Sequence, residues 1–489
     1  MTTISRRRFL VSTGAASLLV SACGAGGGRE ALLPTDPLVG ARETRLAGAD
    51  AKVIRKSMTA GPVDLDLAGR VTPTWGFDGD AIRANVGDIL EVELRNELPE
   101  ETTIHWHGIA IRNDMDGVHD LTQSAVAAGE RFTYRFLVPD PGTHFFHPHT
   151  GLQLDRALYA PLVIDDRDDL GQYDAEHVLV LDDWLEGTPE EAFARLVAGM
   201  DGMDGMEGMD GMEGMDGMEG MASSDLLGGH ASDVSYQMHL INFRPIEDRP
   251  TFDVPAGGRV RLRLINAASD TAYRFAVGGH RLTVTHADGF PVEPVEVDAV
   301  LLGMGERFDV IVTASAGAHP IVAIAEGTDQ VAGAVLRAGP GDPPSPAARP
   351  AELNGQVLTY GDLRPTEAVR LASGQPDTSL TLDLTGNEAD YMWGINGKPM
   401  SDLDPFDIEE GQTVRLTFRN RSTMWHPMHL HGHTFALEET GARKDTVIVR
   451  PDESVSVMFA ADNPGQWMVH CHNTYHLEAG MAGVISYVR

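Results

Sequence analysis

The chain has 489 residues and a formal net charge of -34 at pH 7, from 38 Lys and Arg against 72 Asp and Glu. Its length is sufficient for about three domains, each able to bury its own core. A surface this acidic repels phosphate, so nucleic acid is excluded as an expected partner, whereas cations, including metal ions, are favoured.

The first residues have the features of an export signal. An arginine cluster at 6–8 precedes a mildly apolar run at 9–22, and small residues follow. This pattern is typical of a secretory signal, and the paired arginines resemble the twin-arginine type. The stretch 20–23 also resembles a bacterial lipobox, which would anchor the protein to a membrane through Cys23; a plain cleavable signal with an incidental cysteine is the alternative. We expect a protein of the cell envelope or a secreted one.

The chain has only two cysteines, Cys23 and Cys471. Once the leader is processed, no intrachain disulfide is available, and Cys471 becomes a lone thiol in an exported protein. Such a thiol is liable to oxidation unless something occupies it. A metal ion is the expected occupant.

After the leader, small and polar residues predict a tether that extends to Arg45. From there onward, short runs of alternating apolar and polar residues are bounded by Gly, Pro, Asn or Asp. This period of two with frequent turn signals predicts all-β sandwiches rather than βαβ units. The clearest runs are ILEVELRNEL at 89–98, RFTYRFLV at 131–138, RVRLRLINA at 259–267 and TVRLTFRN at 413–420.

Two breaks divide the chain, one near 165–173 and the other in the Pro-rich stretch 339–350. We therefore predict a signal and tether at 1–45, followed by three domains. The predicted domains span 46–168, 169–340 and 351–489. The phrases VGDILEVELRNEL, AGGRVRLRLINA and EGQTVRLTFRN, one in each domain, predict a threefold repeat of one β-sandwich unit.

The second domain contains a predicted helix, TPEEAFARLVAG, with Thr188 as N-cap and Pro189 at the first helical position. A low-complexity insert at 200–221 follows, with eight methionines at every third position and an acid in each unit. The insert is either an acidic loop without a role or a set of thioethers that binds soft Cu(I). Its neighbours His230 and His239 could assist it, and the other histidines outside the clusters described next are expected to be structural.

Histidines gather in four clusters, two near the end of the first domain and two in the third. In a strand, residues i and i+2 face the same side, so a His-X-His pair presents two imidazoles to one point. Four such pairs in one chain are hard to obtain by accident. The clustered histidines are His105, His107, His147, His149, His426, His429, His431, His470, His472 and His476.

Cys471 lies between His470 and His472, so in a strand its sulfur faces away from the two imidazoles. Two metal centres can then be joined through adjacent covalent bonds, which would conduct electrons. Cys471 and His476, with a second imidazole and a weak axial methionine, form the ligand set of a blue-copper site. His426 and Met481 are the candidates for those two ligands. The eight other clustered histidines are sufficient for a cluster of three coppers.

These four motifs, in this order, resemble those of the multicopper oxidases, the laccase-like family of three tandem cupredoxin domains with Greek-key β-sandwich folds. The likeness covers nearly all of the chain after the leader. It implies four coppers per chain: a type 1 copper on His426, Cys471, His476 and Met481; a type 2 copper on His105 and His429; one type 3 copper on His107, His147 and His472; and the other on His149, His431 and His470.

The resemblance also implies a reaction: one-electron oxidation of a reductant at the type 1 copper, transfer through Cys471, and reduction of O2 to water. That reduction consumes protons, so an acid near the cluster is expected. Asp116 lies where the family keeps its acidic residue; the alternative is a turn residue before Gly117. Glu478 could orient a type 1 ligand or relay a proton from the surface.

Within the family, the reductant could be Cu(I), in a role in copper tolerance, or a small phenol, as in a general laccase. The Met-rich insert resembles those of bacterial copper-resistance oxidases and favours Cu(I). A non-catalytic copper store would need no site of eight histidines, and a two-domain copper nitrite reductase would be shorter. We expect a monomer.

Overall fold

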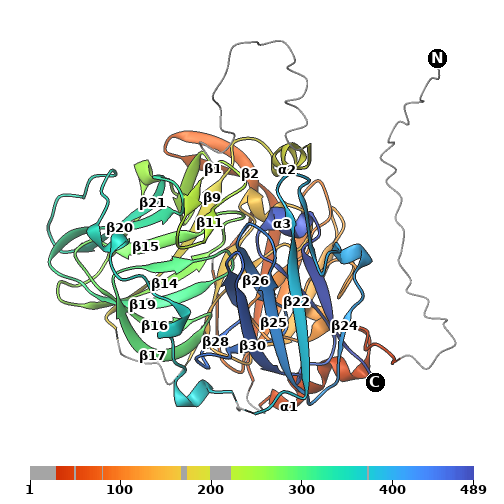
Figure 1. The fold of residues 1–489 in the computed structure, drawn as a ribbon. Coiled ribbons are helices and arrows are strands. Elements are labelled where there is room, and N and C mark those ends of the chain that lie inside the picture. The colour runs from red at the N-terminus through yellow and green to blue at the C-terminus, as the bar shows by residue number, and fades with distance from the viewer. Residues whose placement is uncertain (1–28, 49–50, 80, 167–172, 199–221, 372–373) are drawn as a thin grey trace, which may run out of the picture.

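The computed structural model describes residues 29–48, 51–79, 81–166, 173–198, 222–371 and 374–489. The arginine cluster at 6–8, Cys23 and the Met-rich insert at 200–221 lie outside the described residues. Among the helices of the described chain, none combines the length and apolar character that a membrane span requires. Most of the regular structure is β-strand (Figure 1).

Six sheets of four to six strands form three pairs, and each pair takes its strands from one contiguous segment of the chain. The first sandwich pairs the sheets β2-β1-β4-β6 and β3-β8-β7-β5. The second pairs β12-β9-β14-β19-β16-β17 with β13-β21-β20-β15-β18, and the third pairs β23-β22-β25-β30-β27-β28 with β24-β32-β31-β26-β29. The prediction of an all-β fold of three tandem cupredoxin-like sandwiches is confirmed.

The strands of the first sandwich are β1 (Val53–Leu67), β2 (Arg70–Phe77), β3 (Ile82–Asn85), β4 (Ile89–Asn96), β5 (His105–His107), β6 (Arg131–Leu137), β7 (Gly142–His147) and β8 (Ala160–Asp165). Those of the second are β9 (Ala175–Trp184), β12 (Met238–Ile241), β13 (Thr251–Asp253), β14 (Arg259–Asn266), β15 (Tyr273–Val277), β16 (Leu282–Ala287), β17 (Phe290–Val297), β18 (Val300–Leu302), β19 (Arg307–Thr313), β20 (Gly317–Ala325) and β21 (Val331–Ala338). A separate hairpin joins β10 (Ser223–Ser224) to β11 (Gly229–His230).

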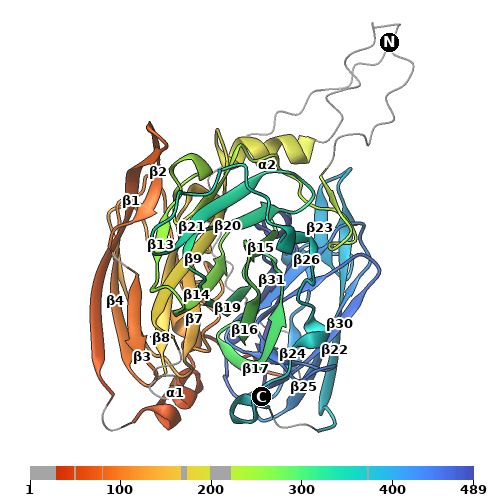
Figure 2. The same cartoon turned by 90° about the vertical axis from the view of Figure 1, so that its left-hand side faces the viewer.

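The strands of the third sandwich are β22 (Thr378–Asn387), β23 (Met392–Ile395), β24 (Phe406–Ile408), β25 (Thr413–Asn420), β26 (His426–Leu430), β27 (Phe435–Leu437), β28 (Arg443–Lys444), β29 (Thr446–Val449), β30 (Ser454–Ala460), β31 (Gln466–Cys471) and β32 (Ala482–Tyr487). Three α-helices are described: α1 (Ala41–Leu46), α2 (Pro189–Ala198) and α3 (Thr474–Glu478). In Figure 2 the first sandwich lies at the left and the third at the right.

The threefold repeat is confirmed by the environment of β4, β14 and β25. Each of these strands pairs in parallel with the first strand of its sandwich and antiparallel with a later one. Each ends in an asparagine, Asn96, Asn266 or Asn420, whose amide donates to two backbone carbonyls and whose oxygen accepts the N–H two residues later. The same set of asparagine hydrogen bonds therefore fixes the end of all three strands.

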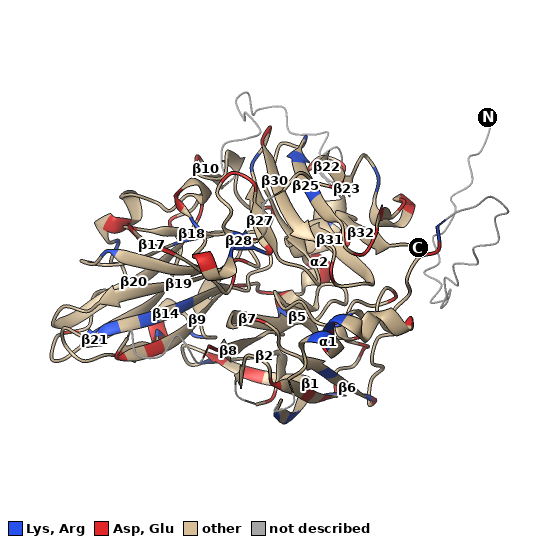
Figure 3. Ribbon diagram, turned by 90° about the horizontal axis from the view of Figure 1, so that it is seen from below, with Lys and Arg blue, Asp and Glu red and all other residues tan. Residues whose placement is uncertain are grey.

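The predicted alternation of buried and exposed residues holds in β4 and β25 but not in β14, where all but the first residue are buried. The reason is a buried ion-pair network in which Arg261 and Arg263 pair with Asp309. Thr143 of the first sandwich donates to the same carboxylate at 2.6 Å. Figure 3 shows several basic positions along β14. The polar face of β14 is thus covered by a neighbouring sandwich instead of by solvent.

The predicted tether is wrong for its described part. Residues 29–46 form what we call the N-terminal strap, which packs against the first and third sandwiches. Leu32 is buried and its N–H donates to the backbone of β32 at 2.8 Å. Arg42 of α1 donates to the carbonyl of Ala110 at 2.9 Å. The small and polar composition of the segment concealed these few anchoring side chains.

The predicted helix of the second domain is confirmed as α2. Its N-cap is Thr188, whose hydroxyl accepts the N–H of Glu191 at 3.2 Å, and Pro189 is its first residue. α2 lies against α3 of the third sandwich, with the ring of Phe193 stacked 6.5 Å from that of Tyr475 (Figure 1). The helix therefore covers the segment that carries the last histidine cluster.

Candidate metal centres

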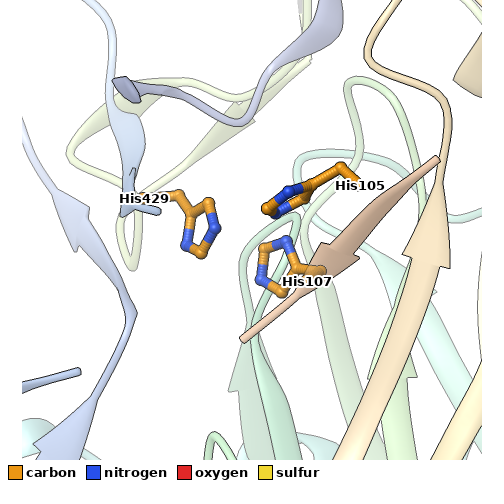
Figure 4. Close-up of side chains that lie close together, drawn as sticks. All are labelled: His105, His107 and His429. Atoms are coloured by element: carbon orange, nitrogen blue, oxygen red, sulfur yellow. The ribbon is translucent and has the colours of Figure 1, made fainter. Parts of the chain in front are cut away.

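Two strand pairs present the histidines. In the first sandwich, β5 and β7 place His105 opposite His147, and in the third, β26 and β31 place His429 opposite His470. The two sandwiches meet at these strand ends, so imidazoles far apart in the sequence converge (Figure 4). Ring nitrogens lie within 4.8 Å of one another in three groups: His105, His107 and His429; His107, His147 and His472; and His149, His431 and His470. We call these eight residues the larger cluster.

Backbone carbonyls fix which nitrogen of each ring faces inward. In His105, His147, His429 and His470, Nδ1 donates to a carbonyl at 2.8–3.0 Å, which leaves Nε2 for the interior. The inward atoms Nε2 of His105, His147 and His429 and Nδ1 of His107 are buried without a hydrogen-bond partner. Buried polar atoms normally find partners. These orphaned nitrogens therefore fit bound metal ions.

In the third group the inward ring nitrogens lie close to one another. Nε2 of His470 lies 3.4 Å from Nε2 of His149 and 3.1 Å from Nε2 of His431. Burial, reinforced by the neighbouring imidazoles, lowers the pKa of all three rings well below the usual value. The rings are therefore neutral, which is the form that binds a metal.

A fourth group lies inside the third sandwich, and with Met481 we call it the smaller centre. The Cys471 sulfur is 3.6 Å from Nδ1 of His426 and 3.5 Å from Nδ1 of His476, and these two nitrogens are 3.1 Å apart. Met481 is fully buried, and its carbonyl accepts the N–H of Cys471 at 3.0 Å. Burial raises the pKa of the Cys471 thiol, and a coordinated metal would deprotonate it.

The outer nitrogens of the two rings in the smaller centre are also held. Nε2 of His426 is hydrogen-bonded to the Ser422 hydroxyl at 2.7 Å, and Nε2 of His476 to Oδ2 of Asp233 at 2.9 Å. Such outer hydrogen bonds fix the tautomer and ring orientation of a metal-binding histidine. A thiol with two imidazoles and a buried thioether is a donor set suited to copper.

The smaller centre and the larger cluster share one strand end. Cys471 belongs to the smaller centre, whereas its neighbours His470 and His472 belong to two different groups of the larger cluster. The alternation expected for a His-Cys-His strand is therefore present, with the sulfur on one side and the imidazoles on the other. The structure brings together every histidine and the cysteine of the candidate ligand set.

Asp116 lies beside the larger cluster. Its Oδ2 accepts from Nδ1 of His431 at 2.9 Å, and its Oδ1 is 3.2 Å from Nδ1 of His105. The side chain is fully buried, and Oδ1 has no hydrogen-bond partner. The turn interpretation also holds, because Gly117 has φ +82° and a Cβ there would lie 1.9 Å from the carbonyl oxygen of Ile104. The turn places the carboxylate against the imidazoles.

Glu478 is the last residue of α3 and is exposed. It lines a cavity of about 230 Å³ together with residues of the larger cluster, His147, His149, His470 and His472. Within the described part of the chain, no hydrogen bond or ion pair joins Glu478 to a residue of the smaller centre. The geometry therefore places Glu478 at the larger cluster and not at the smaller centre.

Sequence reasoning missed Asp233, which contacts His476 from 243 residues away in the chain. The sequence points only to a near neighbour, His230, three residues earlier. Nδ1 of His230 is 3.0 Å from Oε1 of Glu388 and 3.8 Å from Oδ1 of Asp233. His239 is structural, since its Nδ1 is hydrogen-bonded to the Tyr273 hydroxyl at 2.7 Å. No spacing in the sequence signals a contact made across two sandwiches.

Known proteins resemble the chain over almost its whole length. Models of the family described as multicopper oxidase match residues 67–169, 175–340 and 374–488. The multicopper oxidase MmcO of Mycobacterium tuberculosis is 43% identical, covering 99% of this chain and 97% of its own. A copper resistance protein A homolog of Pseudomonas syringae pv. tomato is 27% identical over 87% of this chain and 90% of its own. The crystal structure of a multi-copper oxidase from Pseudomonas thermotolerans superposes with a TM-score of 0.66 at 28% identity, covering 90% of this chain and 100% of that one.

Proposed function

The chain belongs to the multicopper oxidase family, and we propose that within it this protein is a cuprous oxidase that takes electrons from Cu(I) and passes them to O2, in a role in copper tolerance. The chain is an oxidoreductase and copper is its cofactor. The choice of Cu(I) as electron donor depends on one observation above all. The described segments on either side of the Met-rich insert both connect, through a few intervening residues, to His476 of the smaller centre.

On the first side, the insert follows α2. The ring of Phe193 lies 6.2 Å from that of Tyr391, which in turn is 6.3 Å from the ring of His476. On the second side, the chain resumes at Ala222, whose carbonyl accepts the N–H of Ala231 at 2.8 Å, two residues before Asp233. The two described segments that flank the insert therefore both lead towards His476, and this placement supports Cu(I) as the electron donor.

The side chains around His476 also suit a cation rather than a neutral phenol. The side chain of Asp233 is buried against His476, and Glu388 lies beyond it next to His230. Met392, in β23 of the same hairpin as Glu388, is a large exposed hydrophobic residue. Carboxylates attract any cation, and a thioether and an imidazole favour soft Cu(I).

We assign the copper ligands by the four groups of side chains described above, three in the larger cluster and one in the smaller centre. Bound copper supplies the one-electron chemistry that couples oxidation of the donor to reduction of O2. The proposed ligands are His426, Cys471, His476 and Met481 for type 1 copper; His105 and His429 for type 2; and His107, His147, His472 and His149, His431, His470 for the two type 3 coppers.

Two carboxyl groups are proposed to supply protons for O2 reduction. Asp116 lies beside the imidazoles of the larger cluster, and its buried Oδ1 has no hydrogen-bond partner. Glu478 lies at the cavity that opens onto the same cluster from the other side. Partial desolvation by the surrounding protein and the negative charge of the nearby Glu190 raise the pKa of Glu478, so a larger fraction of it carries a proton near neutral pH.

The N-terminal sequence supports a further part of the proposal, namely export by the twin-arginine route to the cell envelope or medium. Folding before export suits this protein, because its larger cluster needs two sandwiches in contact. Lipid anchoring through Cys23 is proposed on the lipobox-like stretch alone.

The test compares three forms: the full chain, a chain without residues 200–221, and a chain in which the eight methionines of the insert are replaced by leucine. We expect both variants to keep the blue colour and copper content, and to lose about tenfold in kcat/KM for Cu(I). Small phenols should be oxidised as fast as before, or faster. Equal Cu(I) kinetics in all three forms would reject the role of the insert and favour a general laccase.

A further inference from the structure

A fully buried ion pair joins the second and third sandwiches beside the larger cluster. Arg307, the first residue of β19, donates through Nη1 and Nη2 to the two carboxylate oxygens of Asp445, at 2.7 and 2.6 Å. Its Nε donates to the carbonyl of Thr143 in the first sandwich at 3.1 Å. One guanidinium therefore binds to both sandwiches that supply the cluster, although its own sandwich contributes no candidate ligand.

Asp445 lies between two histidines from different sandwiches. Its Oδ1 is 3.3 Å from Nε2 of His107 and 3.4 Å from Nδ1 of His429, and its carbonyl accepts from Nδ1 of His429 at 3.0 Å. These contacts occupy the outer nitrogen of each ring. The inner nitrogens, Nδ1 of His107 and Nε2 of His429, are the orphaned atoms that face the cluster. Asp445 thus sets the orientation of both rings at once.

The packing leaves no room for adjustment. Gly108 follows His107 with φ +82°, and a Cβ there would lie 2.2 Å from Nη2 of Arg307. Gly305 has φ +83°, and a Cβ there would lie 3.0 Å from the His107 ring and 2.9 Å from the His472 ring. The guanidinium and the turn before it therefore contact the histidine segment with only glycine between them.

The charges around the pair are fixed as well. Asp288 accepts the N–H of Arg307 at 2.9 Å and that of Asp445 at 3.1 Å. Nζ of Lys444 lies 3.0 Å from carboxylate oxygens of both Asp288 and Glu306. All five groups are buried, so solvent cannot replace a lost partner.

We propose that Arg307 is a positioning residue for the larger copper cluster. Through Asp445 it fixes the separation and the ring orientation of His107 and His429, and so controls how tightly the cluster holds copper at the edge where the first and third sandwiches meet. The second sandwich, which supplies no ligand, thereby determines retention of the type 2 copper. This inference uses the ligand grouping proposed above and is independent of the electron donor.

Lysine cannot replace arginine in this role, because an ammonium is a point charge and cannot bind both carboxylate oxygens in one plane. Arg307→Lys keeps the positive charge and removes the bidentate hydrogen bonding to Asp445. Loss of an outer partner of a metal-binding histidine costs about 10- to 100-fold in metal affinity. We expect the larger cluster to bind copper more weakly by that factor, whereas the smaller centre, which Asp445 does not touch, keeps its copper.

The matched control is Arg261→Lys. Arg261 lies in the same sheet as Arg307 and also donates from two nitrogens to one buried carboxylate, that of Asp309, at 3.1 and 2.5 Å. Three quantities are measured on each form: copper per chain after exposure to a chelator, the type 2 signal in electron paramagnetic resonance, and the blue absorbance of the smaller centre. Thermal unfolding of the copper-free proteins reports any general loss of stability.

The expected result is selective: Arg307→Lys loses the type 2 signal and keeps the blue absorbance, whereas Arg261→Lys keeps both. An unchanged type 2 signal in Arg307→Lys would overturn the inference. So would an equal loss in the two variants, since any buried ion pair would then suffice. If Arg307→Lys does not fold, Asp445→Asn must show the same selective loss, and a normal type 2 signal in that variant refutes the role.

Discussion

Replacing Asp116 by Asn tests whether the buried carboxyl group beside the larger cluster supplies protons. The asparagine keeps the shape of the side chain and can still accept a hydrogen bond from Nδ1 of His431, which now lies 2.9 Å from Oδ2. It cannot carry the exchangeable proton. Ligand positions should therefore change little, and copper content should be preserved.

The size of the effect follows from the surroundings of Asp116. Its side chain is fully buried and its Oδ1 has no partner, so no water molecule at the surface can take over its function directly. Loss of a positioned general acid slows a reaction by about 10²- to 10⁴-fold. Glu478 lines a cavity that reaches the cluster from another side, so it can still deliver protons. We therefore expect the lower end of this range, about 100-fold or 2.7 kcal/mol in the activation barrier.

The assay is stopped-flow mixing of the fully reduced protein with O2, followed by the return of the blue colour. Reduction of the oxidised protein by the donor should proceed at its normal rate, since the smaller centre is untouched. Asp114→Asn is the matched control: it removes a carboxylate two residues away that pairs with Arg112 near the surface, at 2.6 Å. Reoxidation of Asp116→Asn within about threefold of the unmodified protein would refute the reasoning and leave Asp116 a turn residue.

Two further predictions concern the smaller centre and the second sandwich. Cys471→Ser should abolish the blue absorbance and lower the copper content by about one per chain, and a variant that stays blue would contradict the type 1 assignment. Burial raises the pKa of Asp309, but Arg261 and Arg263 outweigh it and hold this pKa below its usual range. The carboxylate therefore stabilises the fold above its unfolded pKa of about 3.9, and the stabilisation is lost as the pH falls towards the folded pKa. Asp309→Asn should lower the thermal midpoint clearly at pH 7, and the difference should begin to shrink only as the pH falls below about 4. A difference that stays constant down to the lowest pH at which the protein remains folded would be inconsistent with this linkage.

The parts of the molecule that sequence reasoning predicted are those with a short period. His470, Cys471 and His472 follow one another in β31, so strand alternation alone separates the sulfur from the imidazoles. The repeat of β4, β14 and β25 was likewise readable, because each strand carries its own turn and apolar pattern. What the pattern could not show was which polar faces would be covered by another sandwich, as in β14.

The residues that orient the ligands could not be predicted from the sequence pattern, for a physical reason. Asp116 contacts His431 across 315 positions, Asp233 contacts His476 across 243, and Arg307 contacts Asp445 across 138. Each of these contacts joins two sandwiches, and no local propensity or spacing encodes how separate sandwiches dock. Asp116 was found only because the family places an acid there, whereas nothing comparable pointed to Asp233 or Arg307.

A ligand motif in one strand pair can bring two imidazoles to a point, but the larger cluster needs four from each of two sandwiches, held in neutral form with the correct nitrogen inward. The charges that fix those rings, such as Asp445, are themselves fixed by the second sandwich through Arg307. The third domain alone could therefore supply the cysteine, the methionine and the histidines of the smaller centre, whereas the oxygen-reducing site requires all three sandwiches in contact.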